Sequence, residues 1–321
     1  MSIQTPDPIS SPAVQRIDID GREYEVEIYR RVIQEGDAPR IVVVSYQQNL
    51  TAAELLRTCI RSIKTFTPEK HELWVVDNNS PRENLNWLID WPDINLVLNR
   101  TEPLPMEGRG DRNGSLAEPS QCNWGSYANA VGLEIAVRLM DQDTAFLMSL
   151  HMDALPCRSG WLSFLKSKVT GNIGAAGVRL DRSRVTEGVL HVLGYMVDFQ
   201  LFKKLNLDFF PQLPGLDVGD QVTIKLREAG YQVFACPNTI WQPDLASMIP
   251  LSSPFRELHV DRSFDDEGNL IFLHLGRGVR RSSGLHSKGI STQEWIDVVQ
   301  KELDRACGWR SSPETIPCGK N

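Results

Sequence analysis

Residues 41–45 are IVVVS and residues 73–77 are LWVVD, and these two short apolar runs decide the fold. Runs of this kind are typical of strands that are covered on both faces of a sheet. Between them, apolar residues recur at helical spacing from Leu55 to Ile63. The segment Thr51–Glu54 before this stripe predicts a capping box at the start of the helix. Strand, helix and strand in this order predict a right-handed βαβ unit with parallel strands.

Similar patterns extend this unit in both directions along the chain. Residues 16–30 alternate around Asp20-Gly21, which predicts a β-hairpin because both central turn positions need positive φ. We therefore predict an α/β fold in which a central, mostly parallel sheet is flanked by helices and preceded by an N-terminal β-hairpin. Further strands are predicted at 94–98, 145–150, 173–178, 192–197, 232–235 and 270–274, and further helices at 126–140, 160–169, 199–206, 220–229 and 291–305.

Three segments are expected along the chain. Residues 1–38 hold a flexible leader and the hairpin, residues 39–278 form the main α/β domain, and residues 279–321 form a C-terminal loop and helix. Residues 100–122 are rich in Pro, Gly and Arg and lack any apolar period, which predicts a long loop. A mobile loop on the substrate side and plain disorder are both open for this segment.

The composition restricts the classes of partner. The 321 residues include 34 basic and 41 acidic side chains, which gives a net charge of −7 and argues against a nucleic-acid partner. No run approaches the 18 apolar residues typical of a transmembrane helix. The six cysteines form no C-x-x-C pair, so we expect reduced cysteines and a cytoplasmic protein. None of these patterns predicts an oligomeric state.

Polar side chains follow three of the predicted strands. Ser45 and Tyr46 stand at the end of the first strand, Asp77 ends the second, and His151-Met152-Asp153 follows the strand at 145–150. Ligands of an open parallel sheet bind beyond the carboxyl ends of the strands. Asp77 could therefore accept hydrogen bonds from a base or a ribose, with Tyr46 against a ring. The alternative is a turn that merely caps the next helix.

His151 and Asp153 have the spacing of a metal site. An imidazole and a carboxylate two residues apart at a strand end can share a divalent ion, and this pair suits Mn²⁺ or similar borderline metals. His274, which follows the apolar run at 270–273, could supply a third ligand from a distant segment. The alternative is a structural histidine beside a helix-capping aspartate.

Five motifs occur in the order and approximate spacing of family 2 glycosyltransferases of the GT-A fold: RIVVVSYQQN, LWVVDNNS, GSYANAVGLEIA, AFLMSLHMDALPCRSGWL and KLREAGYQVFACP. The chain resembles this family, and its rhamnosyltransferase-like members, over roughly residues 40–275. The resemblance implies a hexosyltransferase-like enzyme that uses a nucleoside-diphosphate sugar and inverts the anomeric carbon. It further implies a glycan or lipid-linked acceptor, a role in surface polysaccharide biosynthesis, and a place in the cytoplasm or at the inner face of the membrane.

The resemblance also implies which residues hold the donor. Ser45, Tyr46 and Asp77 match the positions that hold the nucleoside in the family. Asn129 and Gly132 match a helix near the donor, and Met152 lies within the triplet beside it.

The same resemblance implies a divalent metal cofactor, Mn²⁺ or Mg²⁺. His151-Met152-Asp153 takes the place of the metal-binding Asp-x-Asp triplet of the family, and Asp153 matches its last aspartate. His274 resembles a late histidine that completes the metal site in several such enzymes. The first aspartate of the triplet is replaced by His151, which bears on the identity of the metal.

Two carboxylates are candidates for the catalytic base. The family usually has a Glu-Asp pair before a helix that ends like KLREAGY, whereas this chain has Asp217 and Asp220, neither in strict alignment with the pair. Asp220 would serve well as the N-cap of that helix. We therefore prefer Asp217 as the base that takes the proton of the acceptor hydroxyl.

A different class of function is also open. A degenerate glycosyltransferase-like domain could bind a nucleotide sugar or a glycan without turnover, and the replacement of the first aspartate and of the Glu-Asp pair favours this alternative. A sugar-nucleotide pyrophosphorylase or a Rossmann dehydrogenase would need a glycine-rich turn after the first strand. Residues 45–53, SYQQNLTAA, contain no glycine.

Overall fold

The computed structural model of the chain describes residues 12–104, 124–179, 188–212, 215–256, 258 and 260–306. The predicted leader before residue 12, most of the predicted loop at 100–122, and the chain after residue 306 lie outside the described residues. Among the described residues, no helix combines the length and the apolar character needed to cross a lipid bilayer.

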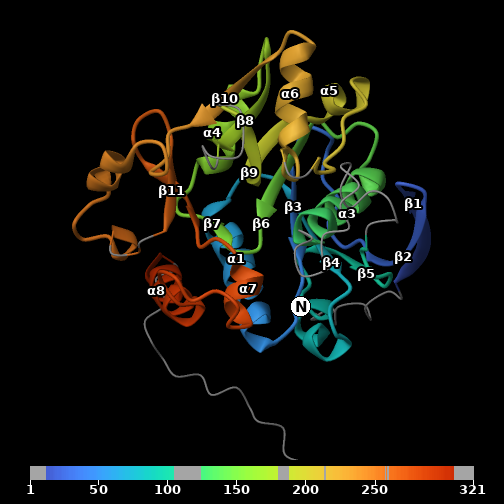
Figure 1. Cartoon of the computed structure of the whole chain (residues 1–321), viewed down its shortest axis with the longest axis horizontal. Helices are drawn as coiled ribbons and strands as arrows, with labels where there is room; N and C mark the ends of the chain where they lie inside the picture. The colour runs from blue at the N-terminus through green and yellow to red at the C-terminus, as the bar shows by residue number, and fades with distance from the viewer. Residues whose placement is uncertain are drawn as a thin grey trace, which may run out of the picture.

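Two sheets and eight α-helices make up the described part of the chain (Figure 1). The larger sheet holds β1 (Ala13–Ile19), β2 (Arg22–Tyr29), β3 (Arg40–Ser45), β4 (Glu72–Asn78), β5 (Asn95–Asn99), β6 (Phe146–His151), β8 (Ile173–Arg179), β9 (Leu190–Asp198) and β10 (Gln232–Cys236). The smaller sheet holds β7 (Ala154–Pro156), β11 (Asp261–Phe264) and β12 (Leu270–His274). The helices are α1 (Leu50–Phe66), α2 (Asn86–Ile89), α3 (Trp124–Leu139), α4 (Trp161–Lys168), α5 (Phe199–Lys204), α6 (Asp220–Glu228), α7 (Gly278–Ser282) and α8 (Thr292–Ala306).

The larger sheet has the strand order β1-β2-β5-β4-β3-β6-β9-β8-β10. Strands β5, β4, β3 and β6 are parallel neighbours, and β8 is parallel to β10. β9 is antiparallel to both β6 and β8, and β2 is antiparallel to both β1 and β5. Only β2 and β9 therefore run against the other described strands of this sheet. The predicted α/β fold with a mostly parallel central sheet and an N-terminal β-hairpin is confirmed.

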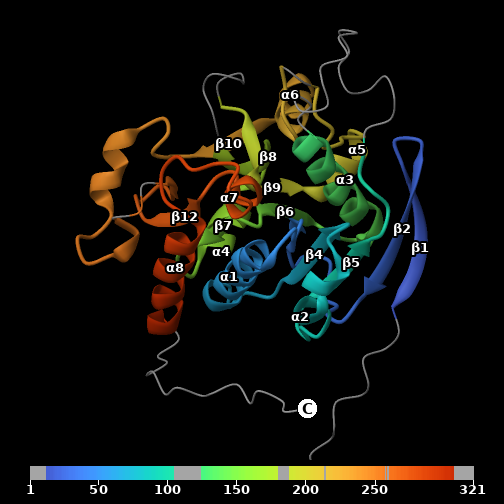
Figure 2. The ribbon, with the colours of Figure 1, turned by 60° about the horizontal axis from the view of Figure 1, so that its bottom comes forward.

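Helices cover both faces of the larger sheet (Figure 2). Alternate residues of a strand point to opposite faces, so Ile41 and Val43 pack with α1, α4 and α8 on one face. Val42 packs with α3, α5, α6 and the hairpin on the other face. This two-sided burial explains why β3 is an unbroken apolar run.

The N-terminal hairpin follows from its turn. Asp20 and Gly21 have φ of 58° and 78°, which is the left-handed backbone that a two-residue hairpin turn requires. β2 then pairs with β5, so the hairpin extends the central sheet.

The start of α1 differs from the prediction. Asn49 is the N-cap, and its Oδ1 accepts the Ala52 N–H at 2.9 Å. The predicted capping box at Thr51–Glu54 is therefore wrong, and the Glu54 carboxylate accepts from Arg57 at 2.7 Å. Asparagine and threonine are both good caps, so the residue types alone could not settle which of the two begins the helix.

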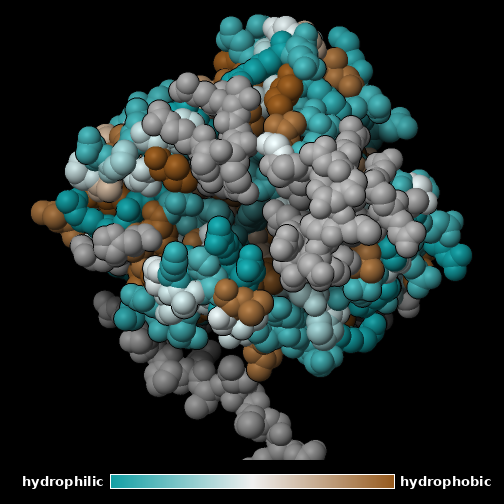
Figure 3. All heavy atoms as spheres, in the orientation of Figure 1, coloured by the Kyte–Doolittle hydropathy of each residue, from teal (hydrophilic) through white to brown (hydrophobic). Residues whose placement is uncertain are grey.

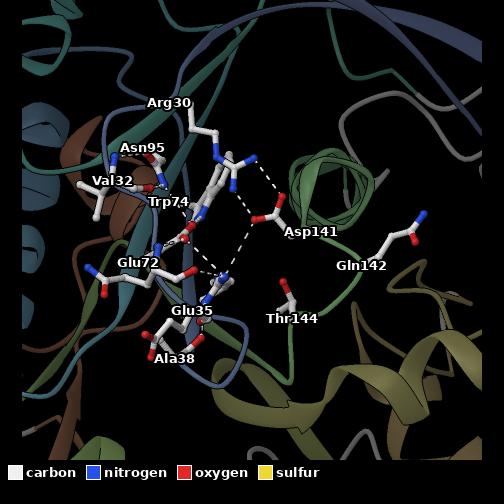
Figure 4. Close-up of polar contacts among 12 residues, drawn as sticks. Arg30, Val32, Glu35, Ala38, Glu72, Trp74, Asn95, Asp141, Gln142 and Thr144 are labelled. Carbon is white, nitrogen blue, oxygen red and sulfur yellow. Dashed lines mark hydrogen bonds and ion pairs between the residues drawn. The ribbon is translucent and has the colours of Figure 1, made fainter.

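A buried ion pair closes the amino-terminal ends of β3 and β4, at the edge opposite to the polar strand ends. Arg40 and Glu72 are 1% and 0% exposed, with Arg40 Nη2 3.4 Å from Glu72 Oε1. The Glu72 carboxylate also accepts hydrogen bonds from Gln34 N, Trp74 Nε1 and Asn95 Nδ2 (Figure 4). A charge that is fully withdrawn from water needs such partners.

Arg40→Met is expected to lower the free energy of unfolding by about 3–5 kcal/mol, because it leaves the buried Glu72 charge without its counterion. The matched control is Arg30→Met, since Arg30 and Asp141 form an ion pair in which the side chains are 31% and 36% exposed. An exposed pair contributes at most about 1 kcal/mol. Urea denaturation of both variants checks this, and equal losses would contradict the assignment.

Candidate metal and donor site

Three parallel strands bring their polar ends to one edge of the sheet. Ser45 of β3 is in register with Asp77 of β4, and Val44 is in register with His151 of β6. Residues that are far apart in the sequence therefore lie side by side at the carboxyl ends of the strands, which is where an open α/β sheet binds ligands.

The Asp77 carboxylate organises one half of this edge. It is fully buried and accepts hydrogen bonds from Ser45 Oγ at 3.0 Å, Gln47 Nε2 at 3.3 Å and Ser80 Oγ at 2.6 Å. Burial raises the pKa of Asp77, against these hydrogen bonds, which lower it. Tyr46 beside it is 41% exposed. The nucleoside contacts expected for Ser45, Tyr46 and Asp77 stay predictions, and the structure adds that Asp77 ties three polar side chains together.

A small second sheet, which the sequence patterns do not predict, brings His274 to Asp153. β7 begins directly after Asp153, and it pairs with β12 so that Ala154 faces His274. β11 pairs with the other side of β12, so that Asp261 faces His274. The Leu275 N–H also donates to the Asp153 carbonyl at 2.9 Å.

His151, Asp153 and His274 meet with their ligand atoms within 4.8 Å of one another. Asp153 Oδ1 lies 3.8 Å from His151 Nδ1 and 3.6 Å from His274 Nε2. The Asp153 and His274 side chains are buried, whereas that of His151 is 23% exposed. Among the described residues this is the one group of three His, Cys, Asp or Glu side chains with the spacing of a metal site.

The pKa values of the two histidines in this group are shifted in opposite directions. Burial lowers the pKa of His151 to about 4, against the smaller opposing effects of Asp153 and Asp217. Burial also acts to lower the pKa of His274, but the Asp153 and Asp261 carboxylates outweigh it and raise that pKa. Burial acts to raise the pKa of Asp153, and the two imidazoles outweigh it, so this pKa is lowered. Burial thus favours the neutral imidazole at His151, whereas the two carboxylates favour the protonated imidazole at His274.

The donor set fits a divalent ion. His274 Nδ1 lies 3.1 Å from the Asp261 carboxylate, so in the neutral ring Nδ1–H donates to Asp261 and the Nε2 lone pair faces Asp153. Gly278 N donates to Asp153 Oδ2 at 2.7 Å, on the other oxygen. In this neutral form of His274, two acceptors, Nε2 and Asp153 Oδ1, face each other at 3.6 Å. A cation would bind both, and imidazole with carboxylate suits Mn²⁺ and related ions.

Gly278 has to be glycine for this arrangement. A Cβ at this position would lie 2.6 Å from Asp153 Cβ and 2.6 Å from Leu55 Cδ2. Non-bonded carbon atoms do not approach each other this closely. Only a glycine therefore lets the start of α7 reach the Asp153 carboxylate with its backbone N–H.

The remaining residues expected near the donor have different surroundings. Asn129 Nδ2 lies 3.0 Å from His151 Nε2. A Cβ on Gly132 would lie 2.5 Å from Val44 Cγ1, so this glycine allows close packing of α3 on β3. Met152 is 5% exposed and lies in the core. Asn129 therefore contacts the metal group directly. Gly132 and Met152 contribute to the packing of the core around it.

Asp217 lies on the turn before α6, and its negative charge acts on the pKa of His151. The turn packs on β9 because Gly219 has a φ of 76° and would place a Cβ 2.4 Å from Val192 Cγ1. Asp217 Oδ1 accepts the Val218 N–H at 2.8 Å, which orients the carboxylate. The turn thus lies at the same edge as the metal group, and the role of Asp217 as a base stays a prediction.

Asp220 is the first residue of α6, and the N-cap is Gly219. The predicted N-cap role of Asp220 is therefore wrong. Its side chain is 1% exposed, and Oδ2 accepts the Asp217 N–H at 2.7 Å. Asp220 thus holds the backbone of Asp217 in place. The helix itself begins at Asp220, as in the predicted range 220–229, and its N-cap lies one residue earlier than predicted, at the left-handed Gly219.

A third histidine lies beside the group and is not predicted by the sequence patterns. His191 stands near the start of β9, which runs antiparallel to β6, so these residues lie near the end of β6. Its ring centroid is 5.4 Å from that of His151, edge to face at 80°. The Leu193 N–H donates to His191 Nδ1 at 3.1 Å. No sequence signal marked β9 as antiparallel, so nothing placed His191 at this edge.

A basic segment borders the group, and it too is absent from the sequence prediction. Residues 277–288, RGVRRSSGLHSK, hold four Lys or Arg residues and no acidic residue, a charge run that was visible in the sequence. Arg277, Arg280 and Lys288 are exposed, whereas Arg281 donates to the backbone carbonyls of Gly276, Lys288 and Ile290. Figure 3 shows hydrophilic side chains around α7, together with a small hydrophobic group. This segment concentrates positive charge beside Asp153.

The chain matches no model of a known protein family and no curated protein sequence. Among solved structures it is similar to the galactosyltransferase LgtC in complex with donor and acceptor sugar analogues, with 11% identity and a TM-score of 0.43 over 86% of this chain and 98% of that chain. It is also similar to a Drosophila β1,4-galactosyltransferase 7 mutant in complex with manganese, UDP-Gal and xylobiose (13% identity, TM-score 0.33, 62% of this chain and 64% of that chain).

A further similar structure is the 4-diphosphocytidyl-2C-methyl-D-erythritol synthase of Anaerococcus prevotii (9% identity, TM-score 0.37, 63% of this chain and 89% of that chain). Likenesses this distant carry no argument about function.

Proposed function

We propose that the chain is a metal-assisted, inverting glycosyltransferase that moves a sugar from a nucleoside-diphosphate sugar to an acceptor hydroxyl. The observation that carries this proposal is the meeting of His151, Asp153 and His274 beside the basic segment 277–288. A divalent-ion site next to concentrated positive charge suits a ligand with a diphosphate group. The resemblance of the sequence motifs to family 2 glycosyltransferases of the GT-A fold agrees with it.

In this proposal His151, Asp153 and His274 hold a divalent ion, Mn²⁺ or Mg²⁺, which when bound supplies Lewis-acid stabilisation of the charge that develops on the departing diphosphate. Arg277 and Arg280 are exposed and lie on either side of Gly278, whose backbone N–H contacts Asp153. Their guanidinium groups donate hydrogen bonds to the phosphate oxygens. The leaving group is thus oriented from one edge of the site.

Asp217 takes the proton of the acceptor hydroxyl in this proposal. A hydroxyl is a weak nucleophile until a base removes its proton, and a carboxylate positioned by Val218 N–H and by Asp220 is suited to this step. One displacement by the acceptor inverts the anomeric carbon and needs no covalent intermediate. Inversion is proposed because one separate carboxylate is sufficient for it.

The first test is a thermal-shift screen of the full chain with nucleoside diphosphates and nucleotide sugars, each with and without Mn²⁺ or Mg²⁺. A ligand that binds only the folded state adds about 2.7 kcal/mol to the free energy of unfolding at a concentration of 100 times its Kd. This added stability raises the midpoint temperature of unfolding. We expect stabilisation by one nucleoside diphosphate that requires the metal. No shift with any nucleotide would contradict the proposal.

Asp77→Ala is expected to weaken binding of that nucleoside diphosphate by about 1–3 kcal/mol, the size of a charge-assisted hydrogen bond. The reason is that Asp77 holds Ser45 and Ser80 at the edge where the nucleoside is proposed to lie. Isothermal titration calorimetry checks the affinity, with the exposed Asp90→Ala as the control. Unchanged affinity in Asp77→Ala would remove Asp77 from the nucleoside site.

The second candidate is a non-catalytic domain that binds a nucleotide sugar or a glycan. The observation that favours it is His151 in the place of a metal-binding aspartate. A panel of nucleotide sugars incubated with Mn²⁺ separates the two candidates, because the enzyme releases free nucleoside diphosphate by transfer or slow hydrolysis. Binding without release of any nucleoside diphosphate would favour the non-catalytic domain.

The wider setting is part of the same proposal. A hexose, with rhamnose the first sugar to test, would pass to a glycan or lipid-linked acceptor in surface polysaccharide biosynthesis, in the cytoplasm or at the inner face of the membrane. Residues 39–278 would form the catalytic domain, with residues 1–38 and 279–321 as flanking segments. These details come from the sequence resemblance, and product analysis with defined acceptors tests them.

A further inference from the structure

The two imidazoles of the metal group are held in complementary ways. His274 contacts the Asp261 carboxylate through Nδ1 at 3.1 Å, and its Nε2 faces Asp153. His151 Nε2 lies 3.0 Å from Asn129 Nδ2, and the Nδ1 of the same ring faces Asp153. Each ring therefore has one nitrogen toward the common carboxylate and the other nitrogen toward an outer partner.

The proton on each ring decides whether that ring can bind a metal ion. A neutral imidazole has one N–H donor and one acceptor nitrogen. The Asp261 carboxylate can only accept, so it places the proton on His274 Nδ1. The Asn129 amide can donate or accept, and a half-turn of the amide exchanges these roles with little change in shape.

If the Asn129 NH₂ group donates to His151 Nε2, the ring proton sits on Nδ1 and faces Asp153, which blocks metal binding. If the amide is turned so that Oδ1 accepts from Nε2–H, the Nδ1 lone pair faces Asp153. In this second arrangement Asn129 Oδ1 accepts the outer N–H of His151, just as the Asp261 carboxylate accepts the Nδ1–H of His274.

We infer that Asn129 is a positioning residue for metal binding, and that its Oδ1 accepts the Nε2–H of His151 when a divalent ion is held by Nδ1 of His151, Asp153 and His274. The inference rests on the metal site of the proposed function. It assigns Asn129 to the support of a metal ligand, which differs from the direct contact with the donor that the sequence resemblance implies.

The surroundings of Asn129 fit a fixed outer partner. Gly132, three residues later on α3, allows the helix to pack closely on Val44 of β3. Asn78 Nδ2 donates to the neighbouring Ala128 carbonyl and ties the same turn of α3 to β4. The ring of His191 packs edge to face against His151. The helix that carries Asn129 and the imidazole of His151 are therefore both held at the edge of the sheet.

Two substitutions at the same position separate accepting from donating. Asn129→Leu removes both functions, whereas Asn129→Asp keeps an acceptor and removes the donor. Outer-sphere partners of ligating histidines typically contribute about 10–100-fold in metal affinity. We therefore expect Asn129→Leu to weaken Mn²⁺ binding by about 10–100-fold, and Asn129→Asp to bind at least as tightly as the wild type.

The measurement is calorimetric titration of the full chain with MnCl₂, alongside the melting temperature of each variant without metal. Ala128→Asp is the control for added negative charge, because it places a carboxylate one residue away on the same helix, and we expect no gain in affinity from it. If Asn129→Leu fails to fold, the comparison of Asn129→Asp with Ala128→Asp decides.

The outcomes are distinct. Wild-type affinity in Asn129→Leu, or weakened binding in Asn129→Asp, overturns the inference while the metal site itself stands. Absence of Mn²⁺ binding by the wild-type chain overturns the metal part of the proposed function and this inference with it. Loss of affinity in Asn129→Leu with retention in Asn129→Asp supports the inference, since a merely structural role would not distinguish acceptor from donor.

Discussion

Asn in place of Asp217 is expected to lower the rate of sugar transfer by about 10²–10⁴-fold, the usual contribution of a general base. The acceptor hydroxyl has to lose its proton as the new bond forms, and an amide cannot take it. The amide oxygen can still accept the Val218 N–H, so the turn should keep its shape. Nucleotide affinity should stay unchanged because the proposed metal and nucleoside contacts lie on other strands. Single-turnover rates and calorimetric titration of the nucleotide measure the two quantities separately.

Asp220→Asn is the matched control, with the same chemical change three residues away. Asp220 Oδ2 accepts the Asp217 N–H at 2.7 Å, and asparagine retains an oxygen that can make this hydrogen bond. We therefore expect a milder loss of rate and at most a modest loss of stability. A larger loss in Asp220→Asn than in Asp217→Asn would make Asp220 the base, and normal rates in both variants would place the base elsewhere.

The half of the site that could be predicted from the sequence is the half carried by parallel strands. Ser45, Asp77 and His151 each stand at the carboxyl end of an apolar run, and parallel strands bring such ends to one edge. Recognising the runs was therefore enough to place these residues together. The spacing of His151 and Asp153 on one strand end predicted the metal group for the same local reason.

The other half depends on pairings between distant segments. Asp261 reaches His274 only because β11 pairs with β12, and the short strands β7 and β11 have no pattern that distinguishes them from loops. His191 reaches the site because β9 is antiparallel, which hydrophobicity does not reveal. The helix starts at Asn49 and Gly219 depend on backbone dihedrals within one turn, and pattern analysis does not resolve positions that finely.

Asp153→Asn is expected to abolish tight binding of Mn²⁺ and to lower sugar transfer by about 10³-fold or more, because Lewis-acid stabilisation of a leaving diphosphate contributes several kcal/mol. Asp153 Oδ1 is the atom that faces both His151 Nδ1 and His274 Nε2. An amide has no charge to offer a cation there, although its oxygen can still accept the Gly278 N–H. Calorimetric titration with MnCl₂ and transfer assays measure the two losses.

The size of this effect depends on the position of the carboxylate, which a control on the turn between β11 and β12 can show, since this turn lies at the other end of the hairpin from His274. Asp266 is half exposed on the turn between β11 and β12 and pairs with Lys168 outside the metal group, so Asp266→Asn should leave both Mn²⁺ affinity and transfer at wild-type values.

Removal of the metal by a chelator should lower the transfer rate of the wild-type chain to that of Asp153→Asn. Added Mn²⁺ should then restore the transfer rate of the wild type and not that of the variant. If chelated wild-type protein transfers sugar at its normal rate, the charge of the leaving diphosphate is balanced by side chains such as Arg277 and Arg280 without an ion. Asp153 would then have a structural role, because its carboxylate accepts the Gly278 N–H at the start of α7.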